Sequence, residues 1–389
     1  VGESNTTPTS AYTFTCQDDQ AGRFSNSTIE LNPESQYDFY AVYPTSAEVN
    51  ATNLSAQITI GAATQTQVGD SPAHIAQLDP LTGCVKNILP NSVSIPMHHN
   101  AAVMAINVVN NLTTTFGIKS LDIIADDGIT LCGTYDIDIA SGELSNPSNA
   151  SNKITVNVEN SDAISQDGIF KIYAAIAPCT LPENSTLKFV ITDTNNIQYE
   201  FTKTFAAEFD IVAGDLLSTS FNLADAKTMI TYSADFASVP DGFPTSATAQ
   251  TEPKYYTFNG YDIGFYNKNG YAHSSGVDDV KYIIFESVGT TDATSAKIYI
   301  PKLTGYKLSS LIVFGDAKQK HRLSVINGST TVELKGSLNN TTAKNKLLAK
   351  DTEISLAESS DVTYLKIYAA SSALDYKCEG LSLRYTKSE

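Results

Sequence analysis

Short runs of alternating apolar and polar residues constrain the fold of this chain more than any other feature. They recur about every 8–15 residues, separated by turn residues, as in Tyr37–Pro44 (YDFYAVYP), Val103–Val109 (VMAINVV) and Ile169–Pro178 (IFKIYAAIAP). Because successive side chains of a strand point to opposite faces, each run predicts a half-buried strand. In Thr186–Phe205 the residues DTNN separate two such runs, which predicts a β-hairpin. This spacing favours antiparallel sandwiches, so we predict an all-β protein.

The composition agrees with that fold class. Of 389 residues only 17% are charged, Trp is absent, and Tyr (20) outnumbers Phe (16). Ser, Thr and Asn are frequent, which is typical of extracellular β proteins. The sequence contains no apolar span of about 18 residues, so it predicts no membrane-spanning helix. It opens on a polar segment, VGESNTTPTS, which we interpret as the start of a chain whose leader peptide has been removed.

Charge divides the sequence into two parts. Residues 1–226 hold 7 Lys and Arg against 25 Asp and Glu, a net charge of −18. Residues 227–389 hold 18 against 17, a net charge of +1, and the two parts together give −17. Such a step indicates two bodies with different surfaces, and we place their boundary near Ala226. The acidic first part argues against nucleic acid as a partner, because nucleic-acid binders need a basic patch.

A second, weaker boundary lies inside the acidic part. Residues 73–90 lack clear alternation and end in a proline, as expected of a linker. The predicted domains are therefore 1–92, 93–226 and 227–389. The last of these contains about eight short strands in roughly 160 residues, which is the size of a jelly-roll sandwich.

Two adjacent histidines, His98 and His99, lie at the head of the apolar run Val103–Val109. Adjacent side chains on a strand point to opposite faces and cannot bind one metal ion together. The other three histidines follow no metal-ligand spacing. We therefore predict that the pair opens a strand, where a histidine bonds to the backbone, and that the chain has no metal site.

None of the five cysteines belongs to a metal-binding or redox motif. They are Cys16, Cys84, Cys132, Cys179 and Cys378, and the odd count leaves at least one free. Two disulfides stay open, Cys16 with Cys84 and Cys132 with Cys179. Buried free thiols are favoured, because Cys packs well as a small hydrophobe.

No catalytic motif is found in the sequence. It lacks a Gly-x-Ser-x-Gly elbow, a His-Glu-x-x-His pair and a phosphate-binding loop. Its 42 acidic residues make neighbouring carboxylates inevitable, so closeness in sequence is no evidence for glycoside hydrolysis. We predict a protein that is not an enzyme and that uses no cofactor.

Three segments of the acidic part follow one another in a characteristic order. They are YDFYAVYP (Tyr37–Pro44), the histidine-led IPMHHNAAVMAINV (Ile95–Val108) and VAGDLLSTSFNL (Val212–Leu223). In this order they resemble the fimbrillin-like proteins of the Bacteroidetes, relatives of the major and minor fimbrial subunits. The resemblance covers roughly residues 10–225. It implies two tandem transthyretin-like β-sandwiches and an outer-membrane lipoprotein precursor, in which only a lipid anchor contacts the membrane.

The same resemblance implies assembly with other fimbrial subunits by strand exchange. In that family a protease removes the first strand, and the C-terminal strand of a partner fills the exposed groove. The donated strand restores both the apolar packing and the hydrogen-bond ladder. Here about 160 residues follow the last family strand, so we do not expect that strand to be donated. We predict a tip or accessory subunit, not a stalk repeat.

The segments DFASVPDGFPT and YYTFNGYDIGFYNKNGY, after residue 226, are rich in aromatic and turn residues. They resemble the jelly-roll modules of Bacteroidetes surface proteins, which are similar to carbohydrate-binding domains. Tyr offers a flat apolar face and a hydroxyl to a sugar ring, and Asn adds hydrogen bonds. Several of these positions also fit the core and rim of two strands. The candidate ligand-binding residues are Tyr255, Tyr256, Tyr261, Tyr266, Tyr271, Asn267 and Asn269.

Three functions stay open on this basis. The first is an exported cell-surface fimbrial tip or accessory adhesin, whose jelly-roll contacts a carbohydrate or a host ligand. The second is a surface glycan-binding lipoprotein outside any fimbria. The third, a glycan-active enzyme with an unrecognised acid pair, has the least support in the sequence.

Overall fold

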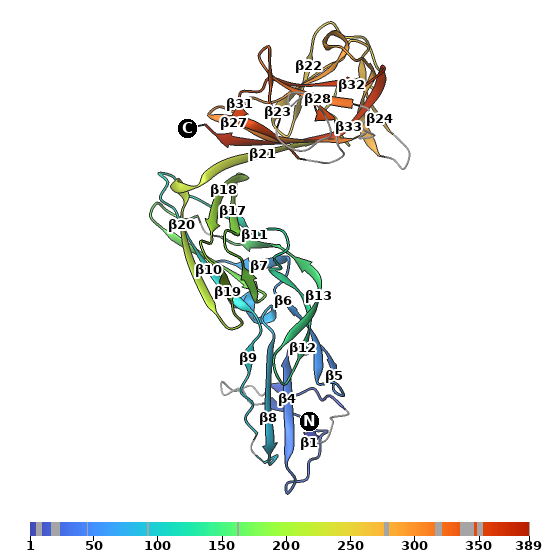
Figure 1. The fold of residues 1–389 in the computed structure, drawn as a ribbon. Coiled ribbons are helices and arrows are strands. Elements are labelled where there is room, and N and C mark those ends of the chain that lie inside the picture. The colour runs from blue at the N-terminus through green and yellow to red at the C-terminus, as the bar shows by residue number, and fades with distance from the viewer. Residues whose placement is uncertain are drawn as a thin grey trace. The chain divides into compact units, whose positions relative to one another are not determined.

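The structure, a computed structural model, divides into two compact units (Figure 1). Unit 1 is Val1–Ala226 and unit 2 is Lys227–Glu389. The described residues are 1–4, 10–16, 24–44, 46–91, 93–161, 163–275, 280–315, 321–334, 346–347 and 353–388. Within them, unit 1 has two clusters of buried apolar side chains and unit 2 has one.

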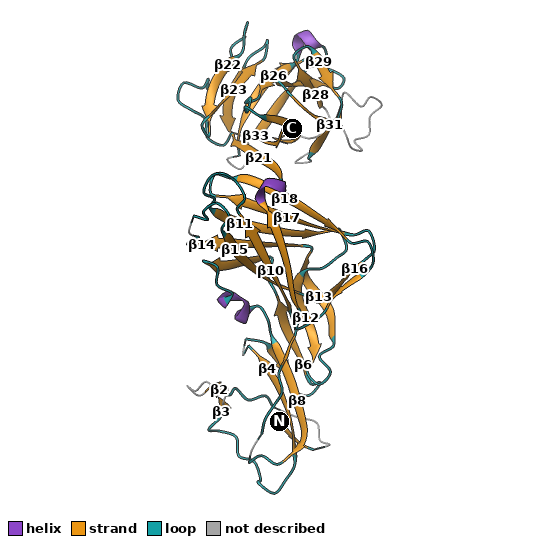
Figure 2. Ribbon diagram, turned by 90° about the vertical axis from the view of Figure 1, so that its left-hand side faces the viewer, coloured by secondary structure: helices purple, strands orange, loops and turns teal. Residues whose placement is uncertain are grey.

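Strands make up nearly all of the regular structure in both units (Figure 2). The described residues contain no α-helix, only the 3₁₀ turns η1 (Ala73–Gln77), η2 (Leu223–Asp225) and η4 (Asp292–Thr294). The predicted all-β fold class is confirmed. The predicted hairpin is also observed, since β17 (Thr186–Asp193) and β18 (Ile197–Thr204) pair antiparallel across a short turn.

Two sheets enclose the larger core of unit 1. One contains, in order, β18, β17, β11 (Ile118–Ala125), β14 (Lys153–Glu159) and β7 (Thr64–Val68). The other contains β15 (Ile169–Ile176), β10 (Ala102–Val109) and β20 (Leu216–Asn222). Alternate residues of β10 are buried and pack with apolar side chains of β11, β14 and β17 in one cluster. The period-2 pattern of the sequence therefore places one face of β10 in the core.

A smaller core in unit 1 involves two further sheets. One contains, in order, β13 (Leu144–Ser151), β12 (Cys132–Asp138), β6 (Ser55–Ile60) and β5 (Glu48–Asn50). The other contains β1 (Gly2–Glu3), β4 (Tyr37–Tyr43), β8 (Leu81–Ile88) and β9 (His98–His99). The described residues of unit 1 also form two short strand pairs: β2 (Thr15–Cys16) with β3 (Phe24–Ser25), and β16 (Cys179–Leu181) with β19 (Phe209–Ile211).

The linker predicted at residues 73–90 is wrong. This segment contains η1 and the eight-residue strand β8, which pairs with β4 on one side and β9 on the other. A shift in the β4–β8 register explains the weak sequence signal, because it interrupts the alternation of buried and exposed positions along β8.

Strands from both sides of the predicted 92/93 boundary share sheets. Strand β6 pairs with β12, and β7 pairs in parallel with β14. Each of the two predicted domains of this region would therefore have to contribute strands to sheets that it shares with the other. Their division into separate transthyretin-like sandwiches stays a prediction.

Two sheets surround the single core cluster of unit 2. The first contains β24 (Tyr271–Ser275), β25 (Lys281–Val288), β33 (Leu374–Lys387), β21 (Lys227–Asp235), β27 (Tyr306–Gly315) and β31 (Ile354–Ser360). The second contains, in order, β22 (Lys254–Phe258), β23 (Tyr261–Tyr266), β26 (Ala296–Tyr299), β32 (Tyr364–Ala369), β28 (His321–Asn327) and β29 (Thr330–Val332), with β30 (Lys346–Leu347) beside β28.

The 14-residue strand β33 organises the first sheet of unit 2, because it pairs with β21, β25 and β27. At Gly380 the β21 backbone comes so close that an added Cβ would lie 2.7 Å from the carbonyl oxygen of Ala234. Only glycine fits this contact without a shift of the backbone. The assignment of unit 2 as a jelly-roll stays a prediction.

Four cysteines, Cys84, Cys132, Cys179 and Cys378, are free thiols, so neither open disulfide forms. The preference for free thiols is confirmed for these four, although Cys84 and Cys179 are only half-buried. Burial raises the pKa of Cys378 to about 12. The same cause, with the charge of Asp210, raises the pKa of Cys179 to about 11. Thiols with such pKa values are poor nucleophiles at neutral pH.

Candidate functional site

The predicted ligand-binding tyrosines lie on the β22–β23 hairpin and on β24, and the pleat separates them into different environments. Strands β22 and β23 pair antiparallel, and Ile263 and Phe265 of β23 point into the core. By the alternation of a strand, Tyr256 and Tyr261 share that inner face, whereas Tyr255 and Tyr266 lie on the outer face.

The inner set packs against the core. Tyr271 is fully buried, and the ring of Tyr256 lies 4.5 Å from that of Phe243. Tyr261, at the margin of this face, contacts Tyr232 edge-on at 5.2 Å. A side chain that is fully buried offers no surface to a ligand, so Tyr271 contributes to packing.

The two predicted asparagines hold the turn that leads into β24. Asn267 is fully buried, and its Nδ2 donates to the carbonyl oxygens of Gly270 and Glu286, both at 2.7 Å. The Nδ2 of Asn269 donates to the Ser287 carbonyl oxygen at 2.9 Å. These bonds tie the turn to the backbone of β25, and the one to Gly270 satisfies a buried acceptor, which is a structural task.

The outer face assembles a row of three tyrosines, of which the sequence analysis named only Tyr255. Register places Tyr255 of β22 beside Gly264, Gly264 beside Tyr299 of β26, and Tyr299 beside Tyr364 of β32. The ring centroids of Tyr255 and Tyr299 are 6.0 Å apart, and those of Tyr299 and Tyr364 are 5.0 Å apart. Gly264 allows this closure, because a Cβ there would lie 2.7 Å from a ring carbon of Tyr255.

Lys297 lies in the next row of the same face. Its Nζ is 5.2 Å from the ring centroid of Tyr266 and 5.5 Å from that of Tyr364, both cation–π distances. Burial raises the pKa of Tyr299, and the neighbouring phenols of Tyr364, Tyr255 and Tyr266 add to the effect. We call Tyr255, Tyr266, Tyr299, Tyr364 and Lys297 the tyrosine face.

Tyr299 and Tyr364 lie far from the β22–β23 hairpin in sequence, which is why clustering along the chain missed them. Their signal was alternation: in AKIY (Ala296–Tyr299) the residues Ala296 and Ile298 are buried, so Lys297 and Tyr299 must face outward. The cross-strand partners follow only from the register.

Unit 1 presents a sheet edge as a second candidate. Strand β20 pairs in parallel with β10, and no strand among the described residues pairs with its other side. An apolar pocket of about 100 Å³ adjoins this edge, lined by Leu217 and Thr219 of β20 together with Phe189, Phe205 and Phe209. An unpaired edge beside an apolar pocket can accept an added strand.

The opposite edge of the same sheet is closed by side chains. Gln67 of β7 donates to the Lys171 carbonyl oxygen at 2.7 Å and accepts from the Tyr173 N–H at 2.8 Å. Gln65 makes the equivalent pair of bonds with Ala175, at 2.8 and 3.0 Å. Both glutamines are buried. Their amides replace a neighbouring strand along β15, so the two edges of this sheet differ.

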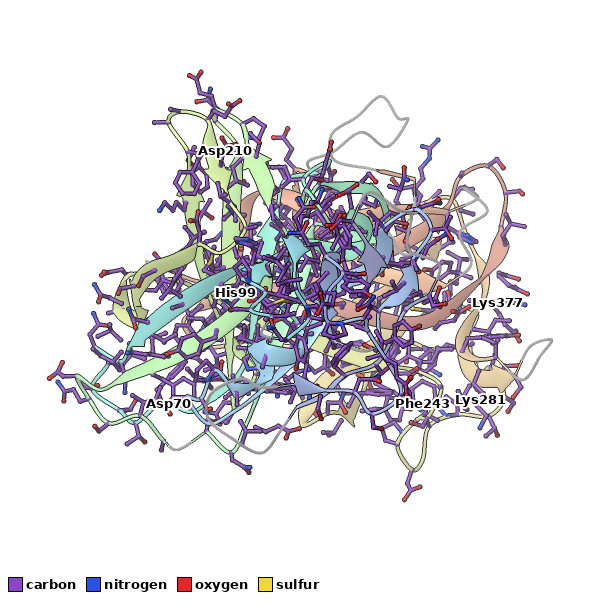
Figure 3. All side chains as sticks on the ribbon, turned by 90° about the horizontal axis from the view of Figure 1, so that it is seen from below. Asp70, His99, Asp210, Phe243, Lys281 and Lys377 are labelled. Carbon is purple, nitrogen blue, oxygen red and sulfur yellow. The ribbon has the colours of Figure 1, made fainter. Side chains whose placement is uncertain are left out.

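A pocket of about 390 Å³ in unit 1 is lined by His99, one of the two adjacent histidines of the sequence analysis, and by its carboxylate partner Asp79. The Nδ1 of His99 (labelled in Figure 3) bonds to the carboxylate of Asp79, whose other oxygen accepts the Ala101 N–H at 3.0 Å. The prediction that the histidine pair opens the apolar strand is wrong: His98 and His99 form the separate two-residue strand β9, which pairs with β8, and the buried strand β10 begins at Ala102. The predicted bond to the backbone is also wrong for His99, which bonds to a carboxylate. No described Ser, Thr or Cys lines this pocket, so the pair has no nucleophile to activate there.

Within the described residues, no group of three or more His, Cys, Asp or Glu side chains is arranged to hold a metal ion. None of the described helices is long and apolar enough to cross a membrane.

Comparison with protein families identifies the fold of unit 1. The fimbrillin-like family matches residues 2–235, more than half of the chain, including nearly all of unit 1 and strand β21. The chain belongs to the fimbrillin-like family. The resemblance seen in the sequence is thereby confirmed for this part of the fimbrillin-like chain.

Solved structures give more distant similarities. A proposed cell adhesion protein from Bacteroides ovatus shares 15% identity at a TM-score of 0.38, over 54% of this chain and 74% of that chain. A second proposed cell adhesion protein, from Bacteroides uniformis, shares 15% identity at a TM-score of 0.37, over 55% of this chain and 81% of that chain. The structure of CBM51-2 in complex with GlcNAc and INT domains, from Clostridium perfringens ZmpB, shares 10% identity at a TM-score of 0.18. This similarity covers 52% of this chain and 37% of that chain. Comparison with curated proteins gave no match.

Proposed function

We propose that this fimbrillin-like chain is an exported, non-enzymatic subunit of a cell-surface fimbria, at its tip or as an accessory. Unit 1 joins other subunits, and unit 2 presents a ligand-binding jelly-roll. The observation that carries the proposal is the family match over residues 2–235, followed by a compact unit with a core of its own. A stalk repeat needs no such second unit. The precursor reaches the outer membrane through a lipid anchor, as the family resemblance implies.

The open edge of β20 supports strand addition as the mode of assembly. Gln65 and Gln67 close the β15 edge, while the β20 edge lies beside apolar side chains. A strand from a partner would pair with β20 and fill the adjoining pocket with its apolar side chains. Such an addition satisfies backbone groups and buries apolar surface at the same time.

The position of β20 supports the tip or accessory assignment. All seven of its residues are in register with β10 inside unit 1, and unit 2 follows directly. A strand that is held in its own sheet and continues into a second compact unit is poorly suited to be donated. The chain would therefore accept a strand without passing one on.

The test is recovery of the chain with sheared fimbriae from producing cells. We expect the unaltered chain to sediment with the fimbriae. The Phe209→Asp variant, which places a charge on a 40% exposed ring of the β20 pocket, should reduce the recovered amount about tenfold. Val68→Asp, at a 54% exposed site elsewhere in unit 1, should leave recovery unchanged. Long homopolymers of the purified chain would contradict the accessory assignment.

The tyrosine face favours a second candidate, a glycan-binding surface lipoprotein outside any fimbria. In that case unit 1 acts only as a spacer. Cells that lack fimbriae distinguish the two functions. If they still hold the chain on their surface in the usual amount, and if Phe209→Asp changes nothing, the lipoprotein function replaces the fimbrial one.

A further inference from the structure

We propose that the tyrosine face binds an anionic polysaccharide, whose sugar rings stack on Tyr255, Tyr299 and Tyr364 while an acidic group pairs with Lys297. The proposal rests on the proposed ligand-presenting role of unit 2 and names its site and ligand class. It replaces the inner-face residues of the sequence analysis with a surface that the register assembles from β22, β23, β26 and β32.

Shape favours a sugar chain as the occupant. The three rings form one continuous row across the sheet, with neighbouring centroids 6.0 and 5.0 Å apart. Tyr255, at the end of the row, is 55% exposed, and the other two are half-buried against each other. The row combines flat apolar rings with hydroxyls at their rims. Sugars have the same combination of an apolar C–H face and polar edges, so they complement such a row.

Charge favours an acidic sugar. Lys297 lies directly opposite Lys366 on the neighbouring strand, and like charges in that position are unfavourable. Lys366 is compensated by an ion pair with Asp292 at 2.8 Å. Lys297 has only the rings of Tyr266 and Tyr364, since no described carboxylate forms an ion pair with it. A bound anion would supply the missing counter-charge.

Asp262, a carboxylate of β23 on the same face, is already engaged. Asp262 lies two residues before Gly264 on β23, and its oxygen accepts the hydroxyl of Thr257 at 2.7 Å. It is therefore held by its own cross-strand partner, away from the Lys297 row. The formal net charge of residues 227–389 is +1, whereas that of residues 1–226 is −18. A polyanion would be repelled by unit 1 and would meet no such barrier at unit 2.

The experiment measures binding of the full chain to five polymers by affinity electrophoresis. Polygalacturonate and dextran sulfate carry carboxylates and sulfates on sugar rings. Fully methyl-esterified pectin and dextran are their uncharged counterparts, and poly-L-glutamate carries carboxylates without rings. We expect retardation by at least one of the two acidic polysaccharides, which also separates a uronate from a sulfate ligand. The uncharged polymers and poly-L-glutamate should bind at least about tenfold more weakly.

Variants assign the binding to the site. Lys297→Met and Tyr255→Ala should each weaken binding about tenfold. Lys377→Met is the matched control, because its Nζ lies 4.8 Å from the centroid of Tyr282 in the other sheet of unit 2 (Figure 3 labels Lys377). Tyr261→Ala controls for the loss of a 41% exposed tyrosine from the inner face. Both controls should bind like the unaltered chain, and near-UV circular dichroism checks that each variant is folded.

Three results would overturn the proposal: no retardation by either acidic polysaccharide, equal binding of poly-L-glutamate, or equal losses in Lys297→Met and Lys377→Met. The test of the proposed function is separate. A chain that sediments with fimbriae but binds no acidic polysaccharide would remove this ligand class and leave the fimbrial role. A chain that binds the polysaccharide but fails to sediment with fimbriae would remove the fimbrial role and leave this ligand class.

Discussion

Asp79 shows how a single buried side chain holds the segment between β9 and β10 in unit 1. Its carboxylate is 7% exposed, and it accepts hydrogen bonds from the His99 ring and from the Ala101 N–H. In Asp79→Ala the buried N–H loses its acceptor, which costs about 1–3 kcal/mol. We expect urea unfolding of unit 1 to show that loss, whereas Asp70→Ala, at an exposed site (Figure 3), should leave the midpoint unchanged. Equal midpoints for the two variants would contradict this role.

The same residues show what a sequence reveals at this scale. Alternation is enough to predict that two adjacent side chains of a strand, such as His98 and His99, point to opposite faces and cannot bind one metal ion together. It does not predict the partner of His99, since Asp79 lies 20 residues earlier in a segment without alternation. Contacts that join distant parts of the chain depend on the fold as a whole.

At the scale of elements, the glutamines of β7 explain why one sheet edge in unit 1 is closed. We predict that Gln67→Leu, which keeps the size of the side chain, destabilises unit 1 by about 1–3 kcal/mol, because the Tyr173 N–H and Lys171 carbonyl lose their partners. Hydrogen exchange of the Tyr173 amide should become faster. Gln57→Leu, at an exposed position of β6, should change neither quantity. Unaltered exchange at Tyr173 would mean that the edge is protected in another way.

Elements with regular alternation, such as β10 and the β17–β18 hairpin, could be predicted from sequence because their own residues encode one buried face. Strand β13 could not. Its sequence, LSNPSNAS, is almost entirely exposed and contains a proline, and it is a strand because it pairs with the edge of β12. The tyrosine face as a whole could not be predicted from sequence for a related reason. Its members come from four strands, and only the register brings them together.

For the whole molecule, the distribution of buried titratable groups predicts different responses of the two units to alkali. Burial raises the pKa of Tyr232 in unit 2 to about 12 and that of Cys378 to about 12. It also raises the pKa of Tyr271, next to Tyr256, and of Tyr385. In unit 1 the pKa of Cys179 rises to about 11, and those of Cys132 and Tyr135 are also raised. The larger set therefore lies in the core of unit 2.

These shifts fix the sign of the pH dependence. In the unfolded chain Cys loses its proton near pH 9.0 and Tyr near pH 10.0. Above those values the unfolded state has released protons that the folded state keeps. Stability that is fully present below pH 9 is thus lost as the pH rises through 10 to 12, by at most about 1.4 kcal/mol per pH unit for each group. We expect calorimetry of the full chain to show two transitions, because each unit has its own core.

The transition of unit 2 should move to lower temperature more steeply than that of unit 1 between pH 10 and 12. Tyr271→Phe, which removes one fully buried phenol and keeps its ring, should make that slope shallower by the contribution of a single proton. If the two transitions fell in parallel and Tyr271→Phe altered neither, proton release from the unit 2 core would not be the cause of alkaline unfolding.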